Sequence, residues 1–369
     1  MERPIFQPVG TPVKELDTPA LLLDLDVATS NIQRLHQFFE DASAKVRPHV
    51  GCHQCPRLAH LQMAAGGTIG GIAVTTVGEA EVFSDAGFND ILVTREVVTR
   101  PAIGRLCELA QLNRITVAVD HPQNVTDLSQ AAAGAGVVLR ALVEMDAGMG
   151  RCGVAPGPAS LDLAKRLKSS ACIEFAGLMA NEGPVPDQDW EKVATENHRR
   201  LQLVVDTREL IEREGLPVAT VSVGGTYNYD SAGRMSGVTE VQAGIYPLMD
   251  HRSSRVRPEF VPAAKILSEV ISHPIESRAI VDAGHKATGP DEGLPVVEGI
   301  PGATASRFSA EHGILDLEFQ AVNGLQPGEK VWMVPFDLAL AVNQFDYFRA
   351  VRQGKLVGFW PIAARGRFD

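Results

Sequence analysis

The stretch RITVAVD (residues 114–120), followed by PQNVTDLSQAAAGAG (residues 122–136), carries the pattern that decides the fold. The first segment is a short apolar run rich in β-branched residues, which is typical of a buried strand. The second segment has the length and pattern of a helix. A strand that is followed directly by a helix is the repeating unit of parallel α/β folds.

The same unit recurs along most of the chain. The other strand candidates are residues 19–26 (PALLLDLD), 44–50, 70–76, 90–95, 137–146, 173–181 and 219–225. Eight strands that alternate with helices over roughly 230 residues match the rhythm of a (β/α)₈ barrel of the TIM type. An open, doubly wound parallel sheet is the alternative.

The C-terminal third of the chain has a different sequence pattern. Short apolar runs such as RAIVDAG (278–284) and EKVWMVP (329–335) are separated by Gly and Pro turns, and helical periodicity is weak. We therefore expect a barrel over residues 20–254. Residues 1–19 and 255–369 are expected to form a mostly β domain.

Composition excludes several classes of function. The 369 residues are 45% hydrophobic and 21% charged, and the formal net charge is −11. Neither nucleic acid nor an anionic membrane is an expected partner, because both call for a clustered basic surface. No apolar run approaches the roughly 20 residues of a membrane span. The five cysteines form an odd set and the N-terminus lacks a signal-peptide pattern, so we expect a cytoplasmic protein with reduced thiols.

The chain resembles a known family from end to end. It is similar to the fold-type III pyridoxal-phosphate enzymes of the D-threonine aldolase and D-serine dehydratase group, which join an alanine-racemase-like barrel to a β domain. The motifs that carry the resemblance include TPALLLDLDVATSNI (18–32), RPHVGCHQCP (47–56), EMDAGMGRCGV (144–154), VSVGGTYNY (221–229) and VDAGHKA (281–287). The resemblance implies a monomer or homodimer, and the polar residues at the predicted strand ends suit a small anionic substrate.

The resemblance also implies a lysine that forms an imine with pyridoxal phosphate, and this lysine falls on Gly51. Glycine cannot form an imine, so pyridoxal phosphate is not expected. Lys45 precedes the strand and lies about 20 Å of extended chain away from residue 51. Lys286 matches a lysine of the family and could take over the role, or it could form a surface or interdomain ion pair.

The loop that would hold the cofactor phosphate is altered as well. Gly224, Gly225, Thr226 and Tyr227 match the glycine-rich run whose backbone N–H groups bind the phosphate in the family. The phenol of Tyr227 would either occupy the pocket or point to solvent. In the second case the loop could still bind phosphate, because a backbone anion site needs no particular side chain.

The family's metal motif is changed too. The matching stretch here is residues 335–339, where Asp337 replaces one ligand and the other ligand has lost its side-chain donor. Zinc held in the family's manner is therefore not expected. The carboxylate of Asp337, with His53 as a second ligand, would suit Mg²⁺ or Mn²⁺ better.

Cys52 and Cys55 form a C-x-x-C motif around His53. A redox pair would need a depressed thiol pKa, and a zinc knuckle would need a second ligand pair that the sequence lacks. Both interpretations are secondary.

The leading hypothesis is a lyase that performs retro-aldol cleavage or dehydration of a hydroxylated amino acid or a related hydroxy acid. Without pyridoxal phosphate, a divalent Mg, Mn or Zn ion would stabilise the developing charge. Candidate catalytic residues are His53 as acid/base or ligand, Arg151 as carboxylate clamp, Glu182 as base or ligand, Lys286, and Asp337 as ligand or base. The alternatives are a metabolite-binding pseudoenzyme and an enzyme that holds pyridoxal phosphate non-covalently or through Lys286.

Overall fold

The computed structural model of the chain describes residues 7–185, 190–289, 292–319, 321 and 325–369. The chain divides into two compact units. The barrel unit contains Arg34–Gly51, Ala59–Gly244 and Arg367–Asp369, and the β unit contains Met1–Gln33, Cys52–Leu58 and Ile245–Gly366.

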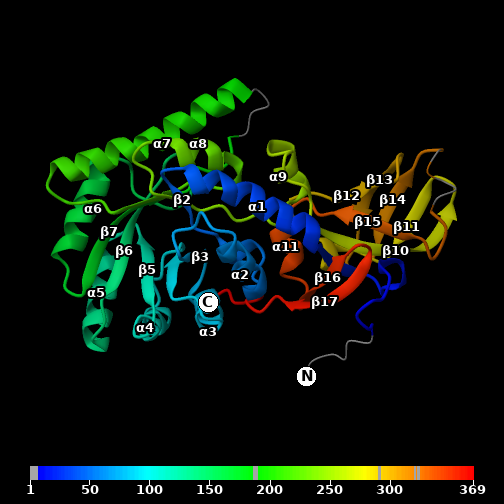
Figure 1. Cartoon of the computed structure of the whole chain (residues 1–369), viewed down its shortest axis with the longest axis horizontal. Helices are drawn as coiled ribbons and strands as arrows, with labels where there is room; N and C mark the ends of the chain where they lie inside the picture. The colour runs from blue at the N-terminus through cyan, green and yellow to red at the C-terminus, as the bar shows by residue number, and fades with distance from the viewer. Residues whose placement is uncertain (1–6, 186–189, 290–291, 320, 322–324) are drawn as a thin grey trace. The chain divides into compact units, whose positions relative to one another are not determined.

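The barrel unit is built on an eight-stranded parallel sheet (Figure 1). Its strands are β2 (Lys45–Val46), β3 (Ile72–Val74), β4 (Asp90–Val93), β5 (Arg114–Val119), β6 (Leu139–Met145), β7 (Ile173–Ala180), β8 (Thr220–Val223) and β9 (Glu240–Val241). They follow the order β2-β9-β8-β7-β6-β5-β4-β3. Isolated parallel bridges pair Val46 with Thr68 and His49 with Ala73, so the two ends of this order are also joined. The barrel expected from the strand–helix repeat is confirmed.

Helices α3 to α6 run outside these strands (Figure 1). The helices that connect or flank the strands are α1 (Leu25–Asp41), α2 (Pro56–Ala64), α3 (Val77–Asp85), α4 (Arg100–Leu109), α5 (Pro122–Ala135), α6 (Pro158–Ser169), α7 (Trp190–Arg213) and α8 (Tyr229–Arg234). Local capping fixes where several of them start. The side chains of Thr76 and Thr99 accept hydrogen bonds from backbone N–H groups in the first turns of α3 and α4. At the other end of α5, Gly136 ends the helix in the left-handed conformation (φ 67°).

One strand assignment from the sequence is wrong. Residues 19–26 were expected to supply the first barrel strand, but β1 (Ala20–Asp24) pairs with β10 (Ala264–Ile275) and β16 (Tyr347–Arg352) in the other sheet. The missing barrel position is taken by β9, which has only two residues. An apolar run of strand length does not identify its partner, and a two-residue strand has no detectable periodicity.

The β unit contains a nine-stranded sheet of mixed direction. Besides β1, β10 and β16 it includes β11 (Arg278–Val281), β12 (Val296–Glu298), β13 (Ala303–Phe308), β14 (Gly313–Leu317), β15 (Lys330–Val334) and β17 (Lys355–Pro361). Short helices α9 (His251–Val256), α10 (His285–Thr288) and α11 (Leu338–Val342) lie between strands. A core cluster joins β1 to residues of β10, β16 and β17, and it contains Leu16, Ala20, Leu22, Leu267, Val351 and Leu356. The predicted mostly β C-terminal domain is confirmed.

None of the helices in the described part of the chain combines the length and apolarity that a membrane crossing requires.

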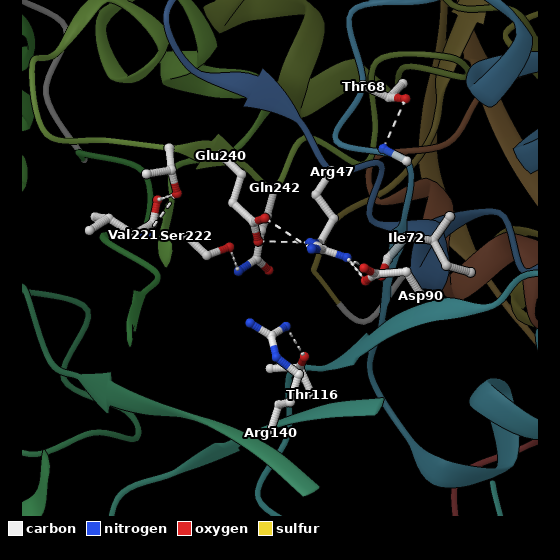
Figure 2. Close-up of polar contacts among 12 residues, drawn as sticks. Arg47, Thr68, Ile72, Asp90, Thr116, Arg140, Val221, Ser222, Glu240 and Gln242 are labelled. Carbon is white, nitrogen blue, oxygen red and sulfur yellow. Dashed lines mark hydrogen bonds and ion pairs between the residues drawn. The ribbon is translucent and has the colours of Figure 1, made fainter. Parts of the chain in front are cut away.

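A buried ion cluster lies at the end of the barrel where most strands begin (Figure 2). Arg47, which is 3% exposed, donates from Nε and Nη2 to the two carboxylate oxygens of Glu240 at 2.7 and 3.0 Å. Its Nη1 donates to Asp90 Oδ1 at 2.7 Å and to the carbonyl of Ile72 at 3.3 Å. Because Glu240 begins β9 and Asp90 begins β4, this one side chain connects strands near opposite ends of the sheet order.

We expect Glu240→Gln to lower the free energy of unfolding by about 3 to 5 kcal/mol, because it leaves the buried Arg47 without half of its charge compensation. The measurement is urea unfolding followed by circular dichroism. The matched control is Glu174→Gln on β7, whose carboxylate is 53% exposed and pairs with Arg140 at 3.0 Å; this change should cost less than about 1 kcal/mol. Equal effects of the two substitutions would contradict a structural role for the cluster.

Candidate active site

The carboxyl ends of the barrel strands bring polar side chains together, as in other barrels of this type. These residues are His49 after β2, Thr75 after β3, Thr94 and Glu96 after β4, Asp120 after β5, Glu144 on β6, Arg151 in the loop after β6, Glu182 after β7 and residues 224–228 after β8. All of them belong to the barrel unit.

His49 is held as a neutral imidazole. Its Nδ1 accepts a hydrogen bond from the backbone N–H of Gly51 at 3.3 Å, and its Nε2 lies 3.2 Å from the hydroxyl of Thr94. That hydroxyl donates to the carbonyl of Val74, so the proton between the two side chains sits on Nε2. Burial, followed by the positive charge of Arg151, lowers the pKa of His49 to about 4. The ring therefore serves as a fixed hydrogen-bonding group at neutral pH.

A side chain at position 51 would require neighbouring side chains to move. A Cβ on Gly51 would lie 2.7 Å from Thr75 Oγ1 and 2.9 Å from His49 Cε1, and both distances are shorter than real Cβ contacts. The hydroxyl of Thr75 and the ring of His49 thus fill the space next to this backbone. Gly51 has no side-chain amine, and its small size also fits the packing of Thr75 and His49.

Glu182 accepts a hydrogen bond from a backbone N–H group that the resemblance assigned to a phosphate. Its carboxylate accepts a hydrogen bond from Gly224 N at 3.0 Å and another from the Tyr227 hydroxyl at 3.1 Å. The neighbouring N–H of Gly225 donates to Asn228 Oδ1 at 2.9 Å. Tyr227 therefore turns toward Glu182, and its ring lies against Gly225, with Cε1 at 2.6 Å from where a Cβ would be.

The electrostatics of Glu182 suit proton transfer. The residue is fully buried, and burial raises the pKa of its carboxyl to about 7 despite the hydrogen bonds from Tyr227 and Gly224, which lower it. Burial and the nearby charge of Glu182 raise the pKa of Tyr227. A carboxyl that ionises near neutral pH can act as general acid or base.

Sequence reasoning did not single out Glu144. This residue is 3% exposed on β6, and burial, followed by the charge of Glu96, raises the pKa of its carboxyl to about 8. Asp120 and Glu182 act in the same direction, whereas the exposed Arg151 lowers it. The sequence did contain one sign of a functional role for Glu144: this acidic residue lies within the apolar strand run VVLRALVEMD.

The β unit contains the other predicted site residues. His53 is buried and its Nδ1 accepts a hydrogen bond from Cys55 N at 3.1 Å. Lys286 is exposed and forms an ion pair with Glu311, as its structural interpretation predicted. Catalytic roles for His53, Lys286 and Asp337 stay predictions.

The cysteines do not match a reactive redox pair. Cys52 and Cys55 are both free thiols. Burial, followed by the charges of Asp250 and Asp337, raises the pKa of Cys52, and burial raises that of Cys55 to about 11. A redox-active cysteine needs the opposite shift.

The predicted divalent-metal site is contradicted. Asp337 caps α11 by accepting a hydrogen bond from Ala339 N at 3.0 Å, and its other oxygen pairs with Arg252 at 2.8 Å. Across the residues that the structure describes, no three His, Cys, Asp or Glu side chains are grouped so that they could hold a metal ion. The carboxylate that was expected to bind metal is instead taken up by helix capping and an ion pair.

Comparisons with known proteins cover both units. The family model "Alanine racemase, N-terminal domain" matches residues 23–251, and "Putative serine dehydratase domain" matches residues 263–351. The chain is 33% identical to 3-hydroxy-D-aspartate aldolase of Paracoccus denitrificans (strain Pd 1222), over 97% of this chain and 94% of the relative. It is 34% identical to D-threonine aldolase of Arthrobacter sp, over 98% and 96%.

Two further comparisons extend the likeness. D-threo-3-hydroxyaspartate dehydratase of Delftia sp. (strain HT23) is 29% identical over 94% of this chain and 97% of the relative. The crystal structure of D-threonine aldolase from Filomicrobium marinum superimposes with a TM-score of 0.94 at 34% identity, covering 98% of this chain and 100% of that one.

These comparisons correct the expectation that pyridoxal phosphate is absent, because the matched relatives belong to the pyridoxal-phosphate-dependent fold-type III group. The residues that the resemblance assigned to holding it nevertheless do not fit that role. Gly51 offers no amine, and the N–H groups of Gly224 and Gly225 already bind Glu182 and Asn228. Covalent attachment at residue 51 is therefore ruled out, because glycine has no amine in its side chain.

We expect Gly51→Ala to lower the free energy of unfolding by about 1 to 3 kcal/mol, since the added methyl collides with Thr75 and His49. Adding Thr75→Ala in the same chain should recover part of this loss. Gly104→Ala on α4 is the control, because no neighbouring atom of the described residues lies within 4 Å of that position. It should be neutral or stabilising by up to about 1 kcal/mol. Thermal unfolding of the four proteins makes the comparison; a Gly51→Ala protein as stable as wild type would contradict the packing argument.

The raised pKa of Glu182 predicts a pH-dependent stability. The folded-state pKa of about 7 exceeds the ordinary value of 4.5, so folding favours the protonated form between these values. Wild-type stability relative to Glu182→Gln should therefore fall by about 1 to 3 kcal/mol as the pH rises from about 5 to about 8. Urea unfolding across this range measures the difference. Glu174→Gln should show no such trend, and a flat difference for Glu182→Gln would mean that the carboxyl ionises normally.

Proposed function

The chain belongs to the alanine racemase-like family of fold-type III enzymes, and on that premise we propose that it is a lyase that cleaves or dehydrates a β-hydroxy amino acid. The observation that carries the proposal is the end-to-end match to relatives named as aldolases of D-threonine and 3-hydroxy-D-aspartate. A relative named as a dehydratase matches both units as well. These relatives support an enzyme of the aldolase and dehydratase type.

The polar groups at the barrel end are suited to this chemistry. In retro-aldol cleavage a base takes the proton of the 3-hydroxyl group, the C2–C3 bond breaks, and its electron pair stays on C2 until a proton arrives there. Dehydration instead removes the proton on C2 and releases the 3-hydroxyl as water. Both reactions need a group that gains and loses a proton near neutral pH, and Glu182 has this property.

We assign Glu182 as the general base and acid and Arg151 as the clamp for the substrate carboxylate. Tyr227 donates to Glu182 and so orients the carboxylate. Arg151 is exposed and carries a positive charge that is felt at both His49 and Glu144, which supports its role in attracting a small anionic group.

A metabolite-binding protein without turnover is the second candidate. It is favoured by Gly51, which lacks the amine of the family's imine, and by the internal hydrogen bonds of Gly224 and Gly225. Catalysis and binding can be separated on one scaffold, since a fold does not determine a function.

The purified protein is assayed with D-threonine, D-serine and threo-3-hydroxy-D-aspartate, with and without added pyridoxal phosphate. Aldehydes, ammonia and keto acids are the products to measure. We expect turnover of at least one compound, and Glu182→Gln should lower kcat by about 10²- to 10⁴-fold because it removes the proton-transferring group. Glu174→Gln should retain wild-type activity. If none of the three compounds is turned over under either condition, the lyase proposal fails and the binding function is favoured.

A further inference from the structure

Three acidic side chains lie at the same end of the barrel as Glu182. Glu96 follows β4, Asp120 follows β5 and Glu144 lies on β6. The charges of the first two are felt at the buried carboxyl of Glu144, together with those of Glu182 and Arg151. Burial and repulsion from these carboxylates favour the protonated form of Glu144 in the free protein, and a positive group beside it would favour the ionised form.

Two oxygen atoms of this cluster lack partners. Glu144 Oε2 and Glu96 Oε1 are buried, and neither has a hydrogen-bond partner among the residues that the structure describes. The whole Glu144 residue is 3% exposed, so bulk water does not solvate it. A buried acceptor without a donor typically costs about 1 to 3 kcal/mol, and such atoms are rare in folded proteins.

A compact donor with positive charge would satisfy both oxygen atoms once Glu144 is ionised. A carboxylate accepts hydrogen bonds, and a primary ammonium supplies three donors and one charge in a small volume. Arg151, a cation whose charge lowers the pKa of Glu144, is exposed and comes from the loop after β6. An ammonium at the acidic cluster and a carboxylate at Arg151 are the two charged groups of an amino acid.

We propose that Glu144 and Glu96 bind the ammonium group of an amino acid whose carboxylate faces Arg151. This inference rests on the proposed function for its setting, and it names the residues that recognise the amino group of the substrate. The site selects amino acids over the corresponding hydroxy acids, because a hydroxyl group brings neither the charge nor the three donors.

Binding should release a proton. With a pKa of about 8 in the free protein, Glu144 is mostly protonated at pH 7, and an ammonium favours its ionised form. Glu96, Asp120 and Glu182 hold the proton on Glu144 in the free protein, whereas Arg151 opposes them. The positive charge of the ammonium group stabilises the ionised form of Glu144 and therefore lowers its pKa.

The test is isothermal titration calorimetry of the full chain with D-2-aminobutanoate and D-2-hydroxybutanoate. The two compounds differ only in the ammonium group, and neither has the 3-hydroxyl that the proposed reaction needs, so binding is measured without turnover. We expect the amino acid to bind at least tenfold more tightly. Repeating the titration at pH 7 in buffers of different ionisation enthalpy should reveal net proton release with the amino acid alone.

Glu144→Gln should weaken binding of D-2-aminobutanoate by roughly 10- to 100-fold and remove most of the proton release. Glu174→Gln is the matched control and should change neither. Equal affinity for the two compounds, binding without proton release, or no binding of the amino acid overturns the inference. These results come from the wild-type protein, so they do not depend on how well the Glu144 variant folds. If D-2-aminobutanoate binds tightly with proton release but no lyase turnover is found, the proposed function is contradicted and the ammonium site is supported.

Discussion

The ion pairs of Arg47 are the interaction on which the barrel unit depends. Glu240 and Asp90 begin strands near opposite ends of the sheet order, and both bind the same guanidinium. A buried charge with one partner removed is strongly unfavourable, so loss of either carboxylate would leave Arg47 poorly compensated between these strands. This cluster lies toward the beginnings of the strands, and the groups suited to chemistry follow their ends.

At the carboxyl ends of the strands, the loop that the resemblance assigned to a phosphate is hydrogen-bonded to side chains of the protein itself. Glu182 supplies the negative charge that the N–H group of Gly224 would otherwise receive from a ligand, and Tyr227 completes its hydrogen bonding. Next to it, Glu144 is buried with one oxygen lacking a partner in the described part of the chain. The carboxylate of Glu182 is thus hydrogen-bonded within the protein, whereas Glu144 keeps one oxygen without a partner among the described residues.

Much of the fold followed from pattern, because strand and helix periodicities are local properties. The exceptions were β1 and β9. Residues 20–24 have the apolar character of a barrel strand, yet they pair with β10 and β16, since pairing depends on tertiary partners that no local pattern specifies. The metal prediction failed for a related reason: the sequence contained an acidic residue at position 337 but not the arginine and the helix end that use it.

The sequence by itself determined the family, the barrel with its β domain, and the absence of an amine at Gly51, because these follow from composition, order and covalent chemistry. Only the tertiary structure decided that Thr75 and His49 fill the space beside residue 51, that Glu182 binds Gly224, and that the carboxyl of Glu144 lies buried within reach of other acidic groups. These facts depend on side chains brought together from separate strands, and both the burial and the charge around each group arise only once the strands are assembled.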